Sequence, residues 1–348
     1  MKKSVMVGMS GGVDSSAAAA ILIEQGYDVC GATMDLLSDD IKKKDNSAIE
    51  DAKKVCDMLG IKHYVIDLKK EFKEFVIDYF TREYISGRTP NPCISCNKHL
   101  KFGLMYQKAK QMGIDYIATG HYARIIENKG EYELRIGKDL SKDQSYVLYN
   151  LTQELLSHIL MPLGEFTKEE IRQKCKELGL SVANKSESME ICFVEDDDYV
   201  SFIQKYTDHI PKSGKIVDTN QNVLGEHKGL INYTIGQRKG IGAYGRPMFV
   251  LEINPEKNEL VLGEKGMEFS TSLIAEDINF ISGKVPNEPF GVQAKVRYQA
   301  RPADAILIPY EKDRLKVEFS TPQRAVTPGQ SVVFYDGDKV LGGGVVCK

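Results

Sequence analysis

A glycine-rich turn close to the N-terminus constrains the fold of this chain more than any other feature. The sequence VGMSGGVDSS, residues 7–16, follows a short apolar segment and precedes an alanine-rich one. Glycine lets backbone amides approach an anion, and the start of a helix carries partial positive charge. The segment therefore predicts a strand, a phosphate-binding loop and a helix in succession. It lacks the Gly-Lys-Ser/Thr of a Walker loop and the spaced glycines of a dinucleotide fingerprint.

The first half of the chain repeats this alternation of apolar and helical segments. The pattern predicts strands at residues 4–7, 27–34, 63–66 and 116–119, and helices at 15–25, 47–59, 72–84 and 98–112. Such alternation is typical of an open α/β fold with a mostly parallel sheet. A capping-box spacing at residues 167–170 predicts a further helix that ends at Gly179. We expect this Rossmann-like catalytic domain to cover residues 1–199.

Two smaller domains are predicted after it. From about residue 200, glycine and proline divide the chain into short β-prone segments, which favours a small mixed or β-rich central domain over residues 200–263. Alternating segments then recur at 291–298, 305–309, 315–319, 331–335 and 340–347. Short strands at this spacing predict a C-terminal β-barrel over residues 264–348.

Composition excludes several classes of protein. The chain has 46 Lys and Arg against 49 Asp and Glu, and this net charge of −3 argues against a protein that coats nucleic acid nonspecifically. A local basic surface is compatible with that balance. Seven cysteines in a chain of this length do not suggest a disulfide framework, and no apolar run is long enough to span a membrane. We expect a cytoplasmic protein with no membrane partner, whose cysteines serve catalysis, metal binding or packing.

The phosphate loop predicts a nucleotide site. Its pattern, S-G-G-x-D-S, is similar to the pyrophosphate loop of enzymes that cleave ATP between the α and β phosphates and adenylate a substrate. Asp14 would then help to hold Mg²⁺. Met34 and Gly120 lie at the carboxyl ends of predicted strands, where open α/β sheets bind ligands. They are either neighbours of adenosine or a core methionine and a turn glycine. The candidate ATP-binding residues are Gly8, Met9, Ser10, Gly11, Gly12, Val13, Asp14, Ser15, Met34 and Gly120.

Three cysteines are candidates for chemistry. Cys93 and Cys96 lie in a proline-bearing loop that leads into a helix, and a helix N-terminus stabilises a thiolate. A structural metal knuckle and a buried thiol are the alternatives, although a zinc knuckle needs a second ligand pair that the spacing does not provide. Cys192 has acidic and hydroxyl neighbours rather than an apolar run. By itself Cys192 would be interpreted as a small core residue.

Several segments together resemble the bacterial tRNA-specific 2-thiouridylases: SGGVDSS, RTPNPCISCNKHLKF, ATGHYAR, KDQSYVLYNL, MPLGEFTKEEIR, SESMEICF, YTIGQRKGIG and VRYQARP. They occur in collinear order over nearly the whole chain. The resemblance implies an adenine-nucleotide hydrolase-type sheet and ATP-dependent 2-thiolation of the wobble uridine in tRNA. It implies that Cys96 is the nucleophile and that Cys192 carries a persulfide. The residues that it assigns to tRNA are Asn91, Pro92, Cys93, His121, Lys142, Asp143, Gln144, Arg297, Tyr298 and Gln330.

One position departs from the family pattern. Familiar members carry Asp where this chain has Cys93, and a carboxylate there can act as a base. Cys93, Cys96 and Cys192 instead offer three thiolates, enough to hold a 4Fe–4S cluster with one open iron. The persulfide route and the cluster route are both open at this point. The resemblance also implies a sulfur donor, which is a cysteine desulfurase, a sulfur relay protein or inorganic sulfide.

Two other classes of function are compatible with parts of the sequence. An ATP-dependent amidotransferase-type ligase would use the same loop to adenylate a small carboxylate, and it would give the three cysteines no role. A non-enzymatic RNA-binding module would have no use for the phosphate loop.

Overall fold

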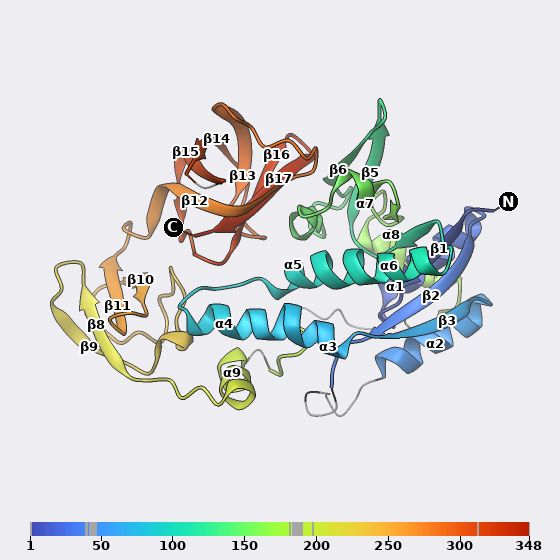
Figure 1. The fold of residues 1–348 in the computed structure, drawn as a ribbon. Coiled ribbons are helices and arrows are strands. Elements are labelled where there is room, and N and C mark those ends of the chain that lie inside the picture. The colour runs from blue at the N-terminus through green and yellow to red at the C-terminus, as the bar shows by residue number, and fades with distance from the viewer. Residues whose placement is uncertain are drawn as a thin grey trace.

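A computed structural model describes residues 2–38, 41, 47–180, 182, 191–196, 198–311 and 313–347. Figure 1 shows three parts: an α/β part that carries the N-terminus, a small sheet at the opposite end, and a β-barrel beside the C-terminus. The α/β part and the barrel confirm the fold class predicted from the sequence. The domain boundaries at residues 199 and 263 remain predictions.

The α/β part is built on a five-stranded sheet in the order β3-β2-β1-β4-β7, and its neighbouring strands are all parallel. The central strand β1 is fully buried at Val5, Met6 and Val7, as expected for a parallel sheet covered on both faces. Strand β1 pairs with β2 on one edge and with β4 on the other. The strands are β1 (Ser4–Gly8), β2 (Asp28–Asp35), β3 (Lys62–Asp67), β4 (Tyr116–Ala118) and β7 (Ile159–Leu160).

Helices cover this sheet. Alanines 17–20 of α1 are almost completely buried, and their small side chains let α1 pack closely against its neighbours. Helix α8 begins with the predicted capping box, in which Thr167 and Glu170 satisfy each other's backbone amides. The described helices of the α/β part that do not carry Cys93 or Cys96 include α1 (Val13–Glu24), α2 (Ala48–Leu59), η3 (Ser145–Leu148), α7 (Gln153–Leu156) and α8 (Lys168–Glu177).

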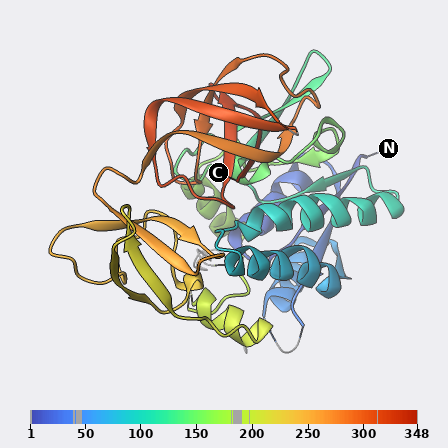
Figure 2. The same cartoon turned by 60° about the vertical axis from the view of Figure 1, so that its left-hand side comes forward.

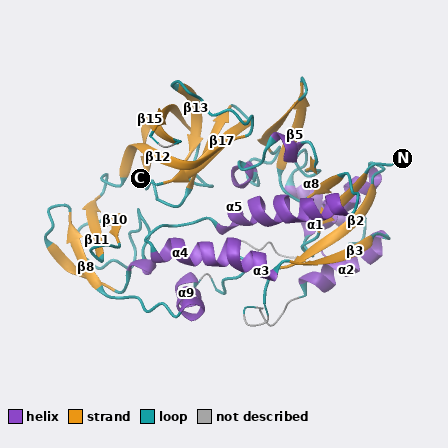
Figure 3. Cartoon of the chain, viewed as in Figure 1, coloured by secondary structure: helices purple, strands orange, loops and turns teal. Residues whose placement is uncertain are grey.

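Two long helical segments lie side by side next to the sheet (Figure 3). The first consists of α3 (Lys69–Phe72), η1 (Lys73–Asp78) and α4 (Tyr79–Ile85), and the second of α5 (Pro92–Cys96), η2 (Asn97–Leu104) and α6 (Met105–Gln111). Both η1 and η2 are π-helical, a conformation that is rare and frequent at functional sites. The second segment begins at Pro92 rather than at the predicted residue 98. Asn91 caps it there and proline suits the first helical position.

The central part is a four-stranded sheet in the order β10-β11-β8-β9, preceded by helix α9. Its elements are α9 (Tyr199–Thr207), β8 (Gly214–Asp218), β9 (Val223–His227), η5 (Leu230–Asn232), β10 (Met248–Asn254) and β11 (Glu259–Glu264). Figure 2 shows this sheet beside the barrel.

The barrel is closed by pairing of β12 with both β15 and β17. Its strands are β12 (Phe269–Phe280), β13 (Phe290–Lys295), β14 (Ala303–Tyr310), β15 (Arg314–Arg324), β16 (Ser331–Asp336) and β17 (Lys339–Val346). A hairpin of the α/β part, β5 (Ala123–Asn128) and β6 (Glu131–Ile136), extends the barrel sheet because β6 pairs with β17. We did not predict this hairpin from the sequence. Within the described residues, no helix is long and apolar enough to cross a membrane.

Candidate active site

The phosphate loop follows β1 at the point where the sheet order reverses, which is where open α/β sheets bind ligands. The Met9 amide donates to the Ala32 carbonyl over 2.7 Å and fixes the start of the loop to β2. Gly11 has φ +70°, and a Cβ there would lie 2.7 Å from the Ala48 carbonyl oxygen. Only glycine fits this position without a shift of the backbone.

The loop ends at the start of α1 in a form suited to an anion. Gly12 is the N-cap residue of α1, and no side chain caps this helix. The first amides of a helix have no intrahelical acceptor, so they are available to phosphate oxygens. The Ser15 hydroxyl accepts from the Ser10 amide at 3.1 Å and lies 3.2 Å from the Ser10 hydroxyl. Both hydroxyls therefore gather at the mouth of the loop.

Asp14, the predicted Mg²⁺ ligand, is held by two groups from other elements. The Lys168 ammonium donates to both carboxylate oxygens, at 2.7 and 2.8 Å, and the Tyr122 hydroxyl donates at 2.8 Å. Lys168 is buried and comes from the first position of α8. Lys168 is not recognisable as a site residue from the sequence, because nothing local links it to the loop. The structure thus adds a buried cation to the nucleotide site.

Gly120 and Met34 differ in how directly they meet the loop. A Cβ on Gly120 would lie 2.7 Å from the carbonyl carbon of Asp14 and 2.9 Å from the Ser15 nitrogen. The backbone of Gly120 therefore packs directly against the start of α1, where a side chain would not fit, so Gly120 does more than form a turn. Met34 is partly buried and packs against the hydrophobic cluster that includes Met6, Phe72 and Met105.

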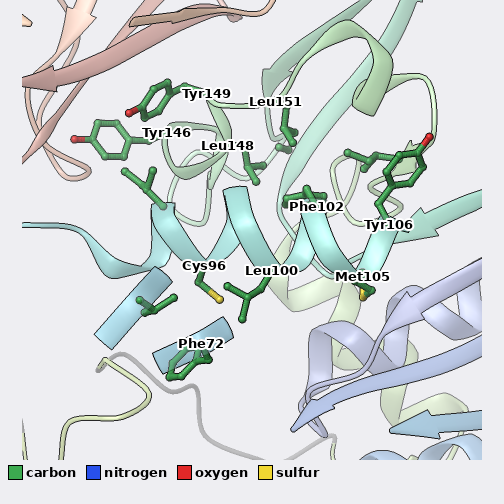
Figure 4. Packing of buried hydrophobic residues seen from close by; sticks show 14 of the residues in the cluster. Phe72, Cys96, Leu100, Phe102, Met105, Tyr106, Tyr146, Leu148, Tyr149 and Leu151 are labelled. Atoms are coloured by element: carbon green, nitrogen blue, oxygen red, sulfur yellow. The ribbon is translucent and has the colours of Figure 1, made fainter. Parts of the chain in front are cut away.

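The first two candidate cysteines lie in the short helix α5, Cys93 on its first turn and Cys96 at its last residue. The Asn91 side chain accepts from the Cys93 amide at 3.1 Å. The Cys93 side chain is exposed, whereas Cys96 is 9% exposed. Figure 4 shows Cys96 and Leu100 pointing from the helix toward the segment that carries Phe72. Burial raises the pKa of the Cys96 thiol, so desolvation opposes the thiolate stabilisation expected from the helix N-terminus.

Cys192 approaches the same place from a distant part of the sequence. Its neighbour Phe193 is buried, with ring centroids 5.7 Å from Phe72 and 5.3 Å from Phe80. Cys192 itself has exposed surface, yet the protein around it desolvates the thiol and raises its pKa to about 12. The charges of Cys96 and Cys93 add to this rise of the pKa, so the three candidate thiols lie within electrostatic range of one another. Among the described residues, no three His, Cys, Asp or Glu side chains are arranged to hold a metal ion.

Lys101 is a cation of this site that the sequence analysis did not select. It lies in the π-helical segment η2, one wide turn after Cys96. Its charge lowers the pKa values of Cys96, Cys192 and His121, and in each case burial has the larger effect. A π-helical turn needs backbone hydrogen bonds from i to i+5, which side-chain patterns do not reveal.

One helical segment joins the cysteines to the phosphate loop. Met105 of α6 has its sulfur 3.4 Å from the position that a Cβ of Gly8 would occupy. Cys96 and Met105 are nine residues apart, and the residues between them form the π-helical stretch η2. The cysteines therefore lie near the start of this segment, and the phosphate loop contacts it nine residues later.

Two residues of the barrel that the resemblance assigns to tRNA, Tyr298 and Gln330, form hydrogen bonds to the α/β part. The Tyr298 hydroxyl donates to the Asp143 carbonyl at 2.8 Å, and the Gln330 side chain donates to the Thr89 carbonyl at 2.8 Å. The second contact fixes the loop that precedes Asn91. His121 is an exception, since it is 7% exposed and its Nδ1 lies 2.7 Å from the Thr119 hydroxyl. Burial holds the pKa of His121 well below its usual value.

The remaining assigned residues also lie near this junction. The Gln144 side chain accepts from the Tyr122 amide at 3.0 Å, and an Arg297 NH2 group donates to the Arg324 carbonyl at 3.0 Å. Lys142 is partly buried, and Pro92 occupies the first position of α5.

Three family models match the chain in order. They are the tRNA methyl transferase HUP domain over residues 3–196, the tRNA methyl transferase PRC-barrel domain over 200–264 and the aminomethyltransferase beta-barrel domain over 270–346. The tRNA-specific 2-thiouridylase MnmA of Acetivibrio thermocellus is 56% identical, with 99% of each chain covered. The MnmA of Clostridioides difficile is 52% identical, with 100% of this chain and 99% of its own covered. This chain belongs to the tRNA-specific 2-thiouridylases.

Membership of the 2-thiouridylases confirms the resemblance found in the sequence. Solved structures are less similar. A 4-thiouridine synthetase–RNA complex with bound ATP is 17% identical, with a TM-score of 0.39 and 59% of this chain and 50% of that chain covered. The U34-tRNA thiolase NcsA of Methanococcus maripaludis, with its 4Fe–4S cluster, is 18% identical, with a TM-score of 0.35 and 59% and 64% covered. Likeness at this level does not bear on the chemistry of a 2-thiouridylase.

Proposed function

We propose that this protein is a tRNA-uridine 2-sulfurtransferase that adenylates a uridine in tRNA with ATP and then replaces its 2-oxygen with sulfur. One observation carries the proposal: a single helical segment holds the candidate nucleophile Cys96 near its start and, nine residues further on, Met105, whose sulfur packs against Gly8 at the base of the phosphate loop. A base bound along this segment would reach both ATP and sulfur. Full-length relatives that are 2-thiouridylases support the same reaction.

In the first step the uridine 2-oxygen attacks the α-phosphate of ATP, and pyrophosphate leaves. The amides at the start of α1 and the hydroxyls of Ser10 and Ser15 would stabilise the departing charge. Mg²⁺ usually binds one or two carboxylates together with substrate phosphates, so Asp14 fits as its protein ligand and Mg²⁺ would neutralise phosphate charge. Lys168, now paired with Asp14, is in position to turn toward a phosphate oxygen when the carboxylate takes another partner.

In the second step a persulfide on Cys192 attacks C2 of the activated base, and AMP leaves with the former 2-oxygen. The Cys96 thiolate then attacks the Cys192 sulfur and breaks the S–S bond, which releases the 2-thiouridine. The transferred sulfur is reduced, and the two cysteines are oxidised to a Cys96–Cys192 disulfide. A reductant must reopen this disulfide, and we therefore propose the cytoplasm as the compartment. Phe193, next to Cys192, packs on Phe72, and Cys96 points toward the segment that carries Phe72 (Figure 4), which supports the meeting of the two thiols in this step.

Both thiols have raised pKa values before the substrate arrives. Lys101 is the nearby charge that lowers them, so it favours the Cys96 thiolate at the moment of attack. The three thiols are not arranged here to hold a metal ion, and we route no step through an iron–sulfur cluster. Cys93, where familiar relatives have Asp, would lie at the exposed rim beside the incoming base. The sulfur donor would be a cysteine desulfurase, a relay protein or sulfide.

For tRNA, the proposal uses the junction between the α/β part and the barrel. The candidate contacts include Asn91, Pro92, Lys142, Gln144 and Arg297. The wobble uridine must leave its stack to reach the helical segment, as bases do in enzymes that modify them.

The test is whether AMP and pyrophosphate form from ATP only when tRNA is present. An adenylating amidotransferase-type ligase would form them with a small carboxylate and ammonia in the absence of tRNA, and an RNA-binding module would form neither. Asp14→Ala should abolish 2-thiouridine formation without unfolding the protein. Normal thiouridine from that variant would contradict the assignment of the loop.

A further inference from the structure

The motif YTIGQRKGIG has no role in the reaction proposed above. Its residues 234–240 form a loop between the short helix η5 and strand β10 of the central part. Arg238 and Lys239 at the tip of this loop are exposed, and together with Gln237 they line a hollow on the surface.

The backbone of this loop is fixed before any ligand binds. The Gln237 side chain accepts from the Thr234 amide and donates to the Lys239 carbonyl, both at 2.9 Å. Two backbone hydrogen bonds attach the loop to β10, from Gly236 to Val250 at 2.8 Å and from Val250 to Gln237 at 3.0 Å. A preformed loop binds a ligand with less loss of conformational entropy than a loose one.

The loop also packs directly on the barrel. Gly236 has φ +81°, and a Cβ there would lie 2.4 Å from the Cβ of Ala325. The adjacent Arg324 guanidinium lies 5.5 Å from the centre of the Phe249 ring, and one of its nitrogens is 3.5 Å from the Gly236 carbonyl oxygen. Arg297 donates to the carbonyl of the same Arg324 at 3.0 Å. A continuous path of contacts therefore runs from Arg297 to the basic loop.

The charge along this path is mostly uncompensated. In the part of the chain that the structure describes, the side chains of Arg238 and Lys239 have no carboxylate partner, and Arg324 has Glu268 at 3.5 Å. By contrast, Arg246 of the same central part is paired with Glu264 at 2.6 Å. Burial lowers the pKa of Arg297, and the positive charge of Arg324 lowers it further. An anion bound here would relieve that repulsion.

We propose that Arg238 and Lys239 bind phosphate groups of the tRNA backbone, so that the RNA-binding surface extends from the barrel at Arg297 onto the central part. Charge complementarity selects this occupant, since a guanidinium and an ammonium that have no carboxylate partner among the described residues suit successive phosphodiesters. The inference rests on the proposed function, because it requires that tRNA is the substrate.

The test measures binding of an unmodified tRNA transcript to the full chain over a range of KCl concentrations. Each lost phosphate contact reduces the slope of log K against log salt by about one, so the Arg238→Ala, Lys239→Ala double variant should lower it by about two. Its Kd near 0.1 M salt should rise by about tenfold or more. Arg246→Ala is the matched control, since it removes a paired cation from the same part, and its slope should equal that of the wild type.

Three outcomes separate the possibilities. A double variant with the slope and Kd of the wild type overturns the inference and leaves the proposed function intact. If the double variant loses heparin binding but binds tRNA like the wild type, the inference is also overturned, because the loop then binds other polyanions and makes no contact with the tRNA. Wild-type protein that does not bind tRNA at all refutes the proposed function, and the inference fails with it.

Discussion

Replacing Gly120 by alanine should displace the phosphate loop, and the structure gives the size of the effect. The new Cβ would lie 2.7 Å from the Asp14 carbonyl carbon and 2.9 Å from both the Asp14 Cβ and the Ser15 nitrogen. Ordinary contacts begin near 3.4 Å, so the start of α1 and the end of β4 must separate by about 0.7 Å. Most of these neighbours are backbone atoms, which cannot rotate away. Overpacking of this kind costs about 1–3 kcal/mol, and misplacement of a reacting group by about 1 Å costs about a hundredfold in rate.

The assay is tRNA-dependent release of pyrophosphate at varied ATP concentration, together with the thermal unfolding midpoint. For Gly120→Ala, kcat/KM for ATP should fall by about a hundredfold, and the midpoint should fall by a few degrees. Gly291→Ala is the control: Gly291 lies in β13 with no atom within 4 Å of its added Cβ and no positive φ, so it should behave like the wild type. Wild-type kcat/KM and stability in Gly120→Ala would refute the close approach of Gly120 to the loop.

Four further predictions follow from particular contacts. Lys168→Met should lower kcat/KM for ATP by about tenfold or more, with partial recovery in Lys168→Arg, because the cation beside Asp14 is lost; unchanged kinetics would contradict this role. Alkylation of Cys192 by iodoacetamide, followed by mass spectrometry, should be slow at pH 7 and accelerate as the pH rises from about 9 toward 12. In the folded protein the Cys192 thiol keeps its proton up to a pH of about 12, whereas an ordinary thiol loses it near pH 9. The stability that the protonated thiol contributes is therefore complete below pH 9 and is lost as the pH rises from 9 to about 12. Hydrogen bonds from Lys339 and then Arg135 lower the pKa of Glu133 from 4.5 to about 2, so the stability that it contributes is complete above pH 4.5 and is lost as the pH falls toward 2. Glu133→Gln should flatten the acid limb of an unfolding titration, and an unaltered limb would count against this contact. Cys93→Asp should retain activity in air without iron, whereas oxygen-sensitive activity that depends on iron and on all three cysteines would favour the cluster route.

The sequence predicted the features that local patterns determine. The loop after β1 was recognisable because its glycines, its short strand and its alanine-rich helix are contiguous. The capping box at Thr167 was recognisable for the same reason, since a cap depends on residues three positions apart. The parallel order of the sheet followed from alternating strands and helices.

Contacts between distant residues could not be predicted in this way. The β5–β6 hairpin joins the barrel through Arg135 opposite Lys339, with ion pairs from Arg135 to Asp338 at 2.7 Å and from Lys339 to Glu133 at 2.9 Å. No local pattern links residues about 200 positions apart. Lys168 escaped selection for the same reason, because its partner Asp14 belongs to another element. The roles assigned to individual site residues from resemblance remain predictions, and the burial of His121 makes its direct contact with tRNA the one most in need of a test.

A single turnover measures whether sulfur passes through Cys192 and Cys96. The enzyme is loaded with persulfide, freed of reductant, and mixed with ATP and unmodified tRNA. Nucleoside and peptide mass spectrometry then quantify 2-thiouridine, AMP and the Cys96–Cys192 disulfide. We expect the three products to appear in equal amounts and none of them to appear without ATP. Thiouridine formed while Cys96 and Cys192 remain free thiols, or formed without AMP, would contradict the persulfide route.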